Sequence, residues 1–204
     1  LRCSPGSENF PDLARRLDTV TAELRESVMR ARVQPVGDLF RKFPRMMRDL
    51  ATACERQVRI ELEGQETGLD KSLLEAIRDP LTHAVRNAVD HGIEPPEERV
   101  KAGKPAQGVV RRRAFQQNGF VVIEVIDDGA GIATGRVLEK AIERGLLTSE
   151  QAGSMTQREV LQLIFVAGFS TAKTLTNVSG RGMGMDVVRT NVEKVGGSVE
   201  LESC

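Results

Sequence analysis

The sequence predicts an α+β fold, a two-layer sandwich in which helices cover one face of a β-sheet. Segments with strand character and segments with helical periodicity are mixed along the chain, without the regular alternation of a parallel α/β fold. The chain has 204 residues, of which 40% are hydrophobic and 28% are charged, and this composition suits one globular domain with an appendage. Lys plus Arg and Asp plus Glu both number 29, so the net charge gives no reason to expect binding to nucleic acid or to a membrane.

The N-terminal part is expected to form a disordered leader followed by one long helix. The leader covers residues 1–11, and the first residue is not a methionine, so we expect the chain to be part of a larger protein. From residue 12 to about residue 32, apolar side chains recur at steps of three and four, which predicts a helix with a coiled-coil-like stripe. The stripe consists of Leu13, Leu17, Val20, Leu24 and Val28. Such a helix cannot bury its stripe alone, so it needs a second helix.

The rest of the chain supplies the strands and helices of the sandwich. The segment VQPVGD, residues 33–38, contains Pro and Gly, breaks the helical period and is expected to be a linker. A helix interrupted by Pro44 is expected over residues 38–53, and a Pro-rich connection is expected after residue 90. Strands are predicted at residues 58–63, 108–115, 120–126 and 197–203. Further helices are predicted at residues 70–90, 137–144, 157–166 and 183–195, with a long polar loop up to residue 179.

A glycine-rich turn follows the third predicted strand and reads IDDGAGI over residues 126–132. Glycine lets the backbone approach a ligand closely and adopt a positive φ. If the carboxylate of Asp127 points inward, it can accept a hydrogen bond from the exocyclic amine of adenine, whereas guanine offers a carbonyl at that position. The same residues also fit a plain Asp-Asp-Gly hairpin turn that binds no ligand.

A second glycine-rich turn, SGRGMGMDVV at residues 179–188, directly precedes a predicted helix. The exposed N–H groups and the dipole of a helix N-terminus bind anions such as phosphate. The alternative is a flexible loop before an ordinary helix. The chain contains no P-loop motif, no strand directly before this turn as a Rossmann fold requires, and no motif set of the eukaryotic-type kinases.

The predicted helix at residues 70–90 carries polar side chains on a second face. Its core pattern is apolar, but His83, Asn87 and His91 recur every four residues and therefore share another face. The amide oxygen of Asn87 is a hard ligand that suits Mg²⁺. His83 could act as a base or orient a phosphoryl group, and His91 could bind ribose or phosphate. Either histidine could instead be an ordinary surface or core side chain, and Asp90 could merely lie near the helix end.

The three cysteines, Cys3, Cys54 and Cys204, are far apart and lack the spacing of a metal site, which favours reduced thiols in a cytoplasmic protein. No apolar run approaches the roughly 18 residues that a membrane span needs, and there is no signal-peptide pattern. The sequence therefore predicts a cytoplasmic protein without membrane insertion.

Four segments, taken in order, resemble a known set of motifs. THAVRNAVDHGIE (82–94) resembles the N box, DDGAGI (127–132) the first glycine box, FVAGFSTA (165–172) the F box and GRGMGMDVV (180–188) the second glycine box. Together, over roughly 110 residues, they resemble the ATP-binding domain of histidine kinases of the GHKL superfamily, in the branch of the CheA-type chemotaxis kinases. The N-terminal part, with the segment TAELRESVMRARVQPVGDLFRKFPRMMRDLA (21–51), resembles the second helix of the dimerisation hairpin in that branch.

The resemblance implies a Bergerat-type ATP-binding fold and a role for each matching residue. Asn87 would hold Mg²⁺ and take part in catalysis, Asp127 would read adenine, and Gly129 and Gly131 would shape the base pocket. His83 would be the second catalytic residue. It occupies the place where hydrolytic relatives such as gyrase carry a glutamate base, and a histidine there fits phosphotransfer to a protein better than hydrolysis.

The resemblance also assigns the segment 145–180 to an ATP lid whose hinge would contain Gly180, Gly182 and Gly184. Phe165 and Phe169 would pack the root of this lid rather than touch the nucleotide. The remaining residues that the resemblance places at the nucleotide are Asp90, His91, Ile132, Ser170, Thr171, Arg181, Met183 and Met185.

In terms of this family, residues 12–34 would be part of a dimerisation hairpin, and residues 35–204 would be a catalytic domain that lacks its final strand. The linker departs from the family, because VQP stands where relatives have an apolar pair before the proline. The implied cofactors are ATP and Mg²⁺. The implied partners are a phosphoacceptor histidine domain, a response regulator, a second copy in a homodimer, and a coupling protein and chemoreceptors reached through missing domains. No nucleic acid is implied.

Two other functions remain open at the level of sequence. The chain could be a GHKL enzyme that hydrolyses ATP, in the manner of gyrase, or a nucleotide-binding scaffold without kinase activity.

Overall fold

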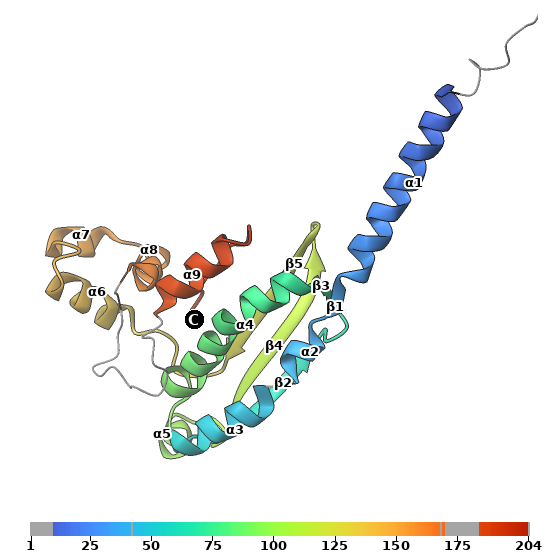
Figure 1. The fold of residues 1–204 in the computed structure, drawn as a ribbon. Coiled ribbons are helices and arrows are strands. Elements are labelled where there is room, and N and C mark those ends of the chain that lie inside the picture. The colour runs from blue at the N-terminus through green and yellow to red at the C-terminus, as the bar shows by residue number, and fades with distance from the viewer. Residues whose placement is uncertain (1–9, 42, 168, 170–183, 204) are drawn as a thin grey trace, which may run out of the picture.

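The protein is described from a computed structural model, and the described residues are 10–41, 43–167, 169 and 184–203. At the centre of the fold is a three-stranded sheet in the order β2–β4–β5, whose strands are Val58–Glu63, Gly108–Gln117 and Phe120–Asp127. β2 pairs parallel with β4, and β4 pairs antiparallel with β5. Helices α3 (Phe43–Ala53) and α4 (Lys71–Asn87) lie over one face of this sheet (Figure 1). The predicted α+β two-layer sandwich is therefore confirmed.

The register of the sheet decides which side chains face the helices. Val110 of β4 is paired with Ile60 of β2 on one side and with Asp127 of β5 on the other. Paired residues of neighbouring strands point to the same face of a sheet, so these three side chains share one face. It is the face under the helices, because Val110 is completely buried in the core. Asp127, the last residue of β5, therefore points inward, as the hypothesis of an adenine-reading carboxylate requires.

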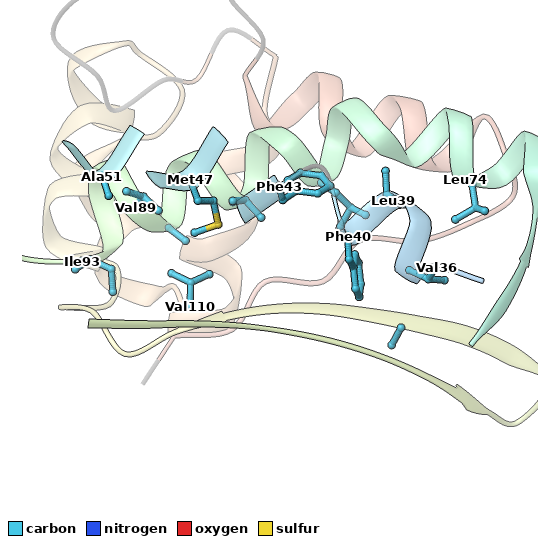
Figure 2. Close-up of a cluster of buried hydrophobic side chains, with 14 residues drawn as sticks. Val36, Leu39, Phe40, Phe43, Met47, Ala51, Leu74, Val89, Ile93 and Val110 are labelled. Carbon is cyan, nitrogen blue, oxygen red and sulfur yellow. The ribbon is translucent and has the colours of Figure 1, made fainter. Parts of the chain in front are cut away.

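The core between the sheet and the helices consists of apolar side chains at helical spacing (Figure 2). α3 supplies Phe43, Met47 and Ala51 at steps of four, so all three point toward the sheet. The residues that α4 and the turn after it supply are Leu74, Leu81, Val85, Ala88 and Val89. Each large apolar side chain that is fully buried contributes about 1.5–3 kcal/mol to folding. This burial fixes α4, which carries Asn87, over the sheet.

The segment between α1 and α3 differs in part from the prediction. Residues 33–38 were expected to be a linker, but Val33–Pro35 forms strand β1, which pairs antiparallel with β3 at Gly68–Asp70. The local sequence does not show this partner, and Pro35 is compatible with a short edge strand because its missing N–H costs no central hydrogen bond. The predicted interruption of the next helix is present: α2 spans Gly37–Phe40, and Pro44 lies in the first turn of α3, where helical N–H groups have no partner in the helix.

Helix α1, Phe10–Ala31, extends away from the sandwich (Figure 1). It begins at Phe10, inside the segment expected to be the leader, and residues 1–9 lie outside the described part of the chain. The part of the apolar stripe from Leu13 to Leu24 is uncovered in this single chain, with exposed fractions of 54% for Leu13, 59% for Leu17 and 63% for Leu24. None of the described helices is long and apolar enough to cross a membrane.

A group of short helices follows β5, beside the sandwich (Figure 1). They are α6 (Thr134–Glu143), α7 (Ser149–Ser154), α8 (Gln157–Gln162), the single-turn 3₁₀ helix η2 (Leu163–Phe165) and, after the glycine-rich segment, α9 (Met185–Glu193). Val137, Ala141, Val160 and Phe169 form a second apolar core among them. Phe165 is also buried, so both phenylalanines of the F box pack inside the fold, as expected.

Two short helices, α5 (Pro96–Lys101) and α7, were not predicted. α5 lies inside the expected Pro-rich connection, and a proline at its first position suits a helix start. α7 begins with a capping box, in which Thr148 accepts a hydrogen bond from the N–H of Gln151 and the Gln151 side chain accepts one from the N–H of Thr148. The pattern Thr-x-x-Gln is a recognised helix-start signal, so this helix was visible in the sequence.

The strand predicted at residues 197–203 is absent, and this prediction is wrong. A strand needs a hydrogen-bonded neighbour, and among the described residues this segment pairs with no strand of either sheet. Ser203 is held in another way: its hydroxyl accepts the N–H of Ile132 at 2.8 Å, and its carbonyl accepts the side-chain amide of Gln157 at 2.9 Å. The apolar alternation of the segment was real, but alternation alone does not supply a partner.

One cation is buried in the core of the sandwich. Arg112 points inward from β4 and is fully buried, with its guanidinium carbon 4.9 Å from the ring centre of Phe40 and 4.4 Å from that of Phe43. None of its three side-chain nitrogens has a hydrogen-bond partner among the described residues. Burial lowers the pKa of Arg112 to about 10. The two aromatic faces are therefore the attractive contacts that oppose its desolvation.

We predict that Arg112→Met leaves the domain equally stable or makes it more stable, because an apolar side chain of similar length carries no desolvation cost. Replacing buried ion pairs by well-packed apolar residues of similar volume is often neutral or stabilising by about 1–4 kcal/mol, and Arg112 has no ion pair or hydrogen bond to lose among the described residues. Thermal and urea unfolding measure this, with the half-exposed Arg113→Met as the matched control, expected within about 0.5 kcal/mol of the parent. A loss of more than about 2 kcal/mol in Arg112→Met would show that the two cation–π contacts outweigh the desolvation.

Candidate functional site

The first part of the site is the corner where β5 ends against the turn after α4. The N–H of Gly129 donates to Oδ1 of Asp127 at 3.0 Å, and the N–H of Ala130 donates to the carbonyl of Gly92 at 3.0 Å. A Cβ on Gly129 would lie 2.0 Å from that carbonyl oxygen, and a Cβ on Gly92 would lie 2.7 Å from Oδ1 of Asp127. Both glycines are therefore required by close approach. Gly131 has a φ of +71°, the left-handed region that favours glycine.

The carboxylate of Asp127 lies in an unusual electrostatic environment. Burial raises its pKa above the ordinary aspartate value of 3.8, and the negative charges of Asp128 and Glu94 raise it further. The hydrogen bond from Gly129 and the positive charge of Lys104 act in the opposite direction. Perturbed carboxyl groups of this kind cluster at binding and catalytic sites.

The turn after α4 is a single turn of π-helix, η1, at Ala88–Gly92. The N–H of Ile93 donates to the carbonyl of Ala88 at 2.8 Å, the hydrogen bond that spans five residues. The sequence predicted a helix up to residue 90, and periodicity does not distinguish an α-helical from a π-helical last turn. Such π-helical turns are frequent at functional sites, and here the turn places Gly92 next to the carboxylate of Asp127.

The second part of the site lies where α9 packs against α4 (Figure 1). The side-chain nitrogen Nδ2 of Asn87 lies 3.3 Å from Sδ of Met185, at the start of α9. The structure therefore brings the N box together with the described end of the second glycine box, Gly184 and Met185. The other predicted residues of the second glycine box, Gly180, Arg181, Gly182 and Met183, and those of the F box, Ser170 and Thr171, lie outside the described residues.

His83 lies on α4 and is half-buried beside α9. Burial lowers the pKa of His83 below 6.5, and the positive charges of Arg86 and His91 lower it further, while Asp186 of α9 opposes them. The imidazole is therefore neutral at pH 7 and has a nitrogen that can accept a proton.

The structure also describes the contacts of three further predicted site residues, Asp90, His91 and Ile132. Nε2 of His91 lies 3.7 Å from Oδ2 of Asp90, and 55% of the His91 side chain is exposed. Asp90 also accepts a hydrogen bond from Sγ of Cys54 at 3.6 Å, and burial together with the charge of Asp90 raises the pKa of that thiol. Ile132 packs against the second apolar core. The roles assigned to these residues remain predictions.

A cluster of four charged side chains lies behind the Asp127 corner, and the sequence did not single it out. Arg99 of α5 is fully buried and hydrogen-bonds to Oε2 of Glu94 at 2.9 Å, to Oδ2 of Asp128 at 2.8 Å and to two backbone carbonyls. Lys104 hydrogen-bonds to Oε1 of Glu94 at 2.8 Å. Burial alone would raise the pKa of Glu94, but the hydrogen bonds from Lys104 and Arg99 lower it overall.

One member of this cluster, Asp128, is tied to the sheet. Oδ1 of Asp128 accepts the N–H of Val109 at 2.9 Å, and the N–H of Asp128 donates to the carbonyl of Val109 at 3.2 Å. The local sequence signal was only a run of charges in a Pro-rich connection. A buried, paired arginine cannot be distinguished from a solvated one by residue type, because both stand among other charges.

The described motifs are those of a nucleotide-binding fold, and comparison with known proteins identifies its family. Residues 76–204 match the family of histidine kinase-, DNA gyrase B-, and HSP90-like ATPases. The chain belongs to this family. Membership of an ATPase family implies that the chain binds ATP, and the sequence-based assignment to the GHKL superfamily is confirmed.

Curated relatives refine the similarity. The sensor histidine kinase CheAY of Helicobacter pylori is 48% identical over 96% of this chain, and the chemotaxis protein CheA of Salmonella typhimurium is 51% identical over 89%. The chemotaxis protein CheA of Treponema pallidum is 46% identical over 95% of this chain. These matches cover 24%, 26% and 24% of the respective relatives, so the chain spans about a quarter of their length. The predicted resemblance to the CheA-type branch is confirmed.

We predict that Asp127→Asn stabilises the nucleotide-free domain and weakens ATP binding. Because the pKa of Asp127 is raised in the folded state, its ionised form opposes folding; this cost is absent below pH 3.8 and complete above the raised pKa. The variant should therefore unfold at a higher temperature than the parent at pH 7, and the difference should shrink as the pH falls toward 3.8. ATP affinity should fall at least about tenfold, since a neutral amide is a weaker acceptor than a carboxylate.

Thermal unfolding at several pH values and ATP titration at pH 7 measure both effects. The exposed Asp49→Asn on α3 is the matched control and should change neither. Unchanged ATP affinity in Asp127→Asn would refute the adenine-reading role, whatever its stability.

Proposed function

We propose that this chain is the ATP-binding catalytic domain of a CheA-like two-component protein histidine kinase. It would transfer the γ-phosphoryl group of ATP to a histidine on a separate phosphotransfer domain, for relay to a response regulator in chemotaxis-type signalling. The observation that carries the proposal is the meeting of three motifs at the C-terminal end of α4: Asn87, the last residue of the helix, contacts Met185, and Gly92, in the turn that follows, contacts Asp127. The names of the relatives, 46% to 51% identical to this chain, support it.

The Asp127 corner fits the base of ATP. The inward carboxylate of Asp127 would accept a hydrogen bond from the exocyclic amine of adenine, while its Oδ1 also accepts the N–H of Gly129. Because guanine presents a carbonyl at the same position, the carboxylate would repel it. The close approach of Gly92 and Gly129 leaves the corner without side chains that would compete for the base.

The last residue of α4, Asn87, fits the phosphates. Mg²⁺, when bound, would neutralise charge on the phosphate oxygens, and Oδ1 of Asn87 is the oxygen ligand that this helix offers. Among the described residues, no group of three or more His, Cys, Asp or Glu side chains could hold a metal ion. Asn87 would therefore act together with phosphate oxygens and waters, the ligand set that Mg²⁺ usually keeps.

His83 would orient the phosphoryl group or accept a proton. Its lowered pKa keeps the ring neutral at pH 7, so the proton-accepting nitrogen is available. Phosphoryl transfer needs mainly positioning and charge neutralisation, and the residues on α4 and α9 offer both.

The remaining proposals concern the protein's surroundings. We place the chain in the cytoplasm, where ATP is available, with a phosphoacceptor histidine domain and a response regulator as partners. A coupling protein and chemoreceptors would be contacted through other parts of the full protein. Residues 12–34 would form part of a dimerisation hairpin, because α1 leaves its apolar stripe uncovered.

The central test is phosphorylation in trans. The chain, labelled ATP and Mg²⁺ should phosphorylate a purified phosphoacceptor histidine domain, and a chelator should abolish the reaction. Asn87→Ala should lower the rate at least about a hundredfold, because it removes the proposed metal ligand. The exposed Gln116→Ala on β4 is the matched control and should keep the parent rate.

The same assay separates the alternatives. Phosphate release without labelling of the acceptor would indicate a GHKL ATPase. ATP binding with neither product would indicate a nucleotide-binding scaffold.

The dimerisation proposal predicts self-association through α1. The double variant Leu17→Glu with Leu24→Glu places charges in the exposed stripe and should weaken association at least about tenfold in sedimentation experiments. Ala22→Glu, on the opposite face of the same helix, is the control. A parent chain that sediments as a monomer at every concentration would contradict the proposal.

A further inference from the structure

Lys104 lies next to the loop that follows Asp127. Its Nζ donates to the carbonyl of Gly129 at 2.8 Å, to the carbonyl of Asp128 at 3.2 Å and to Oε1 of Glu94 at 2.8 Å. Only 35% of the Lys104 side chain is exposed, and the fully buried Arg99 adds a hydrogen bond of 3.1 Å to the same Asp128 carbonyl. Two cationic side chains, of Arg99 and Lys104, therefore hydrogen-bond to two successive backbone carbonyl groups of one short loop.

The two carbonyl groups belong to the peptide units whose N–H groups build the Asp127 corner. The Asp128–Gly129 peptide presents its carbonyl to Arg99 and Lys104, and its N–H donates to Asp127. The next peptide, Gly129–Ala130, presents its carbonyl to Lys104, and its N–H donates to Gly92. In a planar trans peptide the C=O and N–H point in opposite directions, so holding one direction fixes the other.

A rotation of either peptide would reverse this arrangement. Without a cation behind it, the Asp128–Gly129 peptide could turn its carbonyl toward the Asp127 carboxylate, and two acceptors would then face each other. Glycine at residue 129 offers little resistance, because its backbone accepts most φ and ψ values. The charged hydrogen bonds to the carbonyls are the contacts that oppose such a rotation.

We propose that Lys104 is a positioning residue for the base-reading carboxylate: by holding the carbonyls of Asp128 and Gly129, it orients both peptides and thereby Asp127. Arg99 supports Lys104 from the buried side, and Glu94 places both cations. The expected effect of Lys104 on ATP affinity rests on the proposed function, in which Asp127 reads adenine. Its expected effect on the conformation of the loop at residues 128–130 does not rest on that function.

The test compares Lys104→Met with Lys104→Arg and with the exposed Lys101→Met, which lies at the end of α5. Arg99 is left intact because it is completely buried and its loss would unfold the corner. Amide hydrogen exchange of Gly129 and Ala130, measured by NMR without nucleotide, reports the loop directly. Titrations with ATP and with GTP report base reading, and thermal unfolding reports overall stability.

In Lys104→Met, exchange of the Gly129 and Ala130 amides should accelerate about tenfold, and ATP affinity should fall about tenfold with GTP affinity unchanged. Lys104→Arg should keep most of the parent's slow amide exchange and most of its ATP affinity, since arginine is also a cation with several donors. Lys101→Met should match the parent in every measurement.

Three results would overturn the proposal. The first is amide exchange in Lys104→Met equal to that of Lys101→Met. The second is faster amide exchange but unchanged ATP affinity in Lys104→Met, when the separate variant Asp127→Asn does lose ATP binding. The third is an equal loss of ATP and GTP affinity together with a lower unfolding temperature, which would indicate general destabilisation. If Asp127→Asn leaves ATP binding intact, the adenine assignment fails, and the amide exchange still tests whether Lys104 positions the loop.

Discussion

The candidate site depends on one close contact, between the carbonyl of Gly92 after α4 and the loop that follows β5. The N–H of Ala130 reaches this carbonyl at 3.0 Å, and a Cβ on Gly129 would lie only 2.0 Å from its oxygen. Two backbone segments far apart in the sequence approach each other because neither carries a side chain at the point of contact. The π-helical turn brings Gly92 to that point, and the sheet register turns Asp127 inward beneath it. A bulkier residue at Gly92 or Gly129 would separate the Asp127 corner from the helix that carries Asn87.

Two arginines are fully buried among the described residues, and they show how differently a cation can be accommodated in this small fold. Arg99 is surrounded by carboxylates and carbonyls, and its charge orders the loop behind Asp127. Arg112 has no hydrogen-bond partner among the described residues and lies between Phe40 and Phe43. Removing one partner of a paired buried charge is strongly destabilising. A buried charge without a hydrogen-bonded partner carries its desolvation cost in the folded state, and an apolar replacement removes that cost. Charge is thus well compensated at the Asp127 corner and poorly compensated under α2 and α3.

The sequence predicted the central elements well and the connecting ones poorly. The strands on either side of residues 118–119 and the helix that carries Asn87 have strong periodicity, and the structure has them with shifts of a few residues at their ends. Strand β1 and the missing strand at residues 197–203 are opposite errors with one cause: whether an extended segment becomes a strand depends on a partner elsewhere in the chain. For the site, motif spacing selected Asn87 and Asp127, but it could not reveal Gly92, Arg99 or Lys104 as their supports.

The sequence by itself determined the fold class, the order of the motifs and the family, because periodicity, glycine placement and motif spacing are local properties. Only the tertiary structure decided that the Asp127 carboxylate points inward and that Asn87 contacts Met185. It also decided that Lys104 and Arg99 hold the loop that follows Asp127. These facts depend on sheet register, on a π-helical turn and on the burial of charge, each of which is set by residues distant in sequence. The hydrogen bonds and charge interactions at these contacts become strong only when the folded chain excludes water from them.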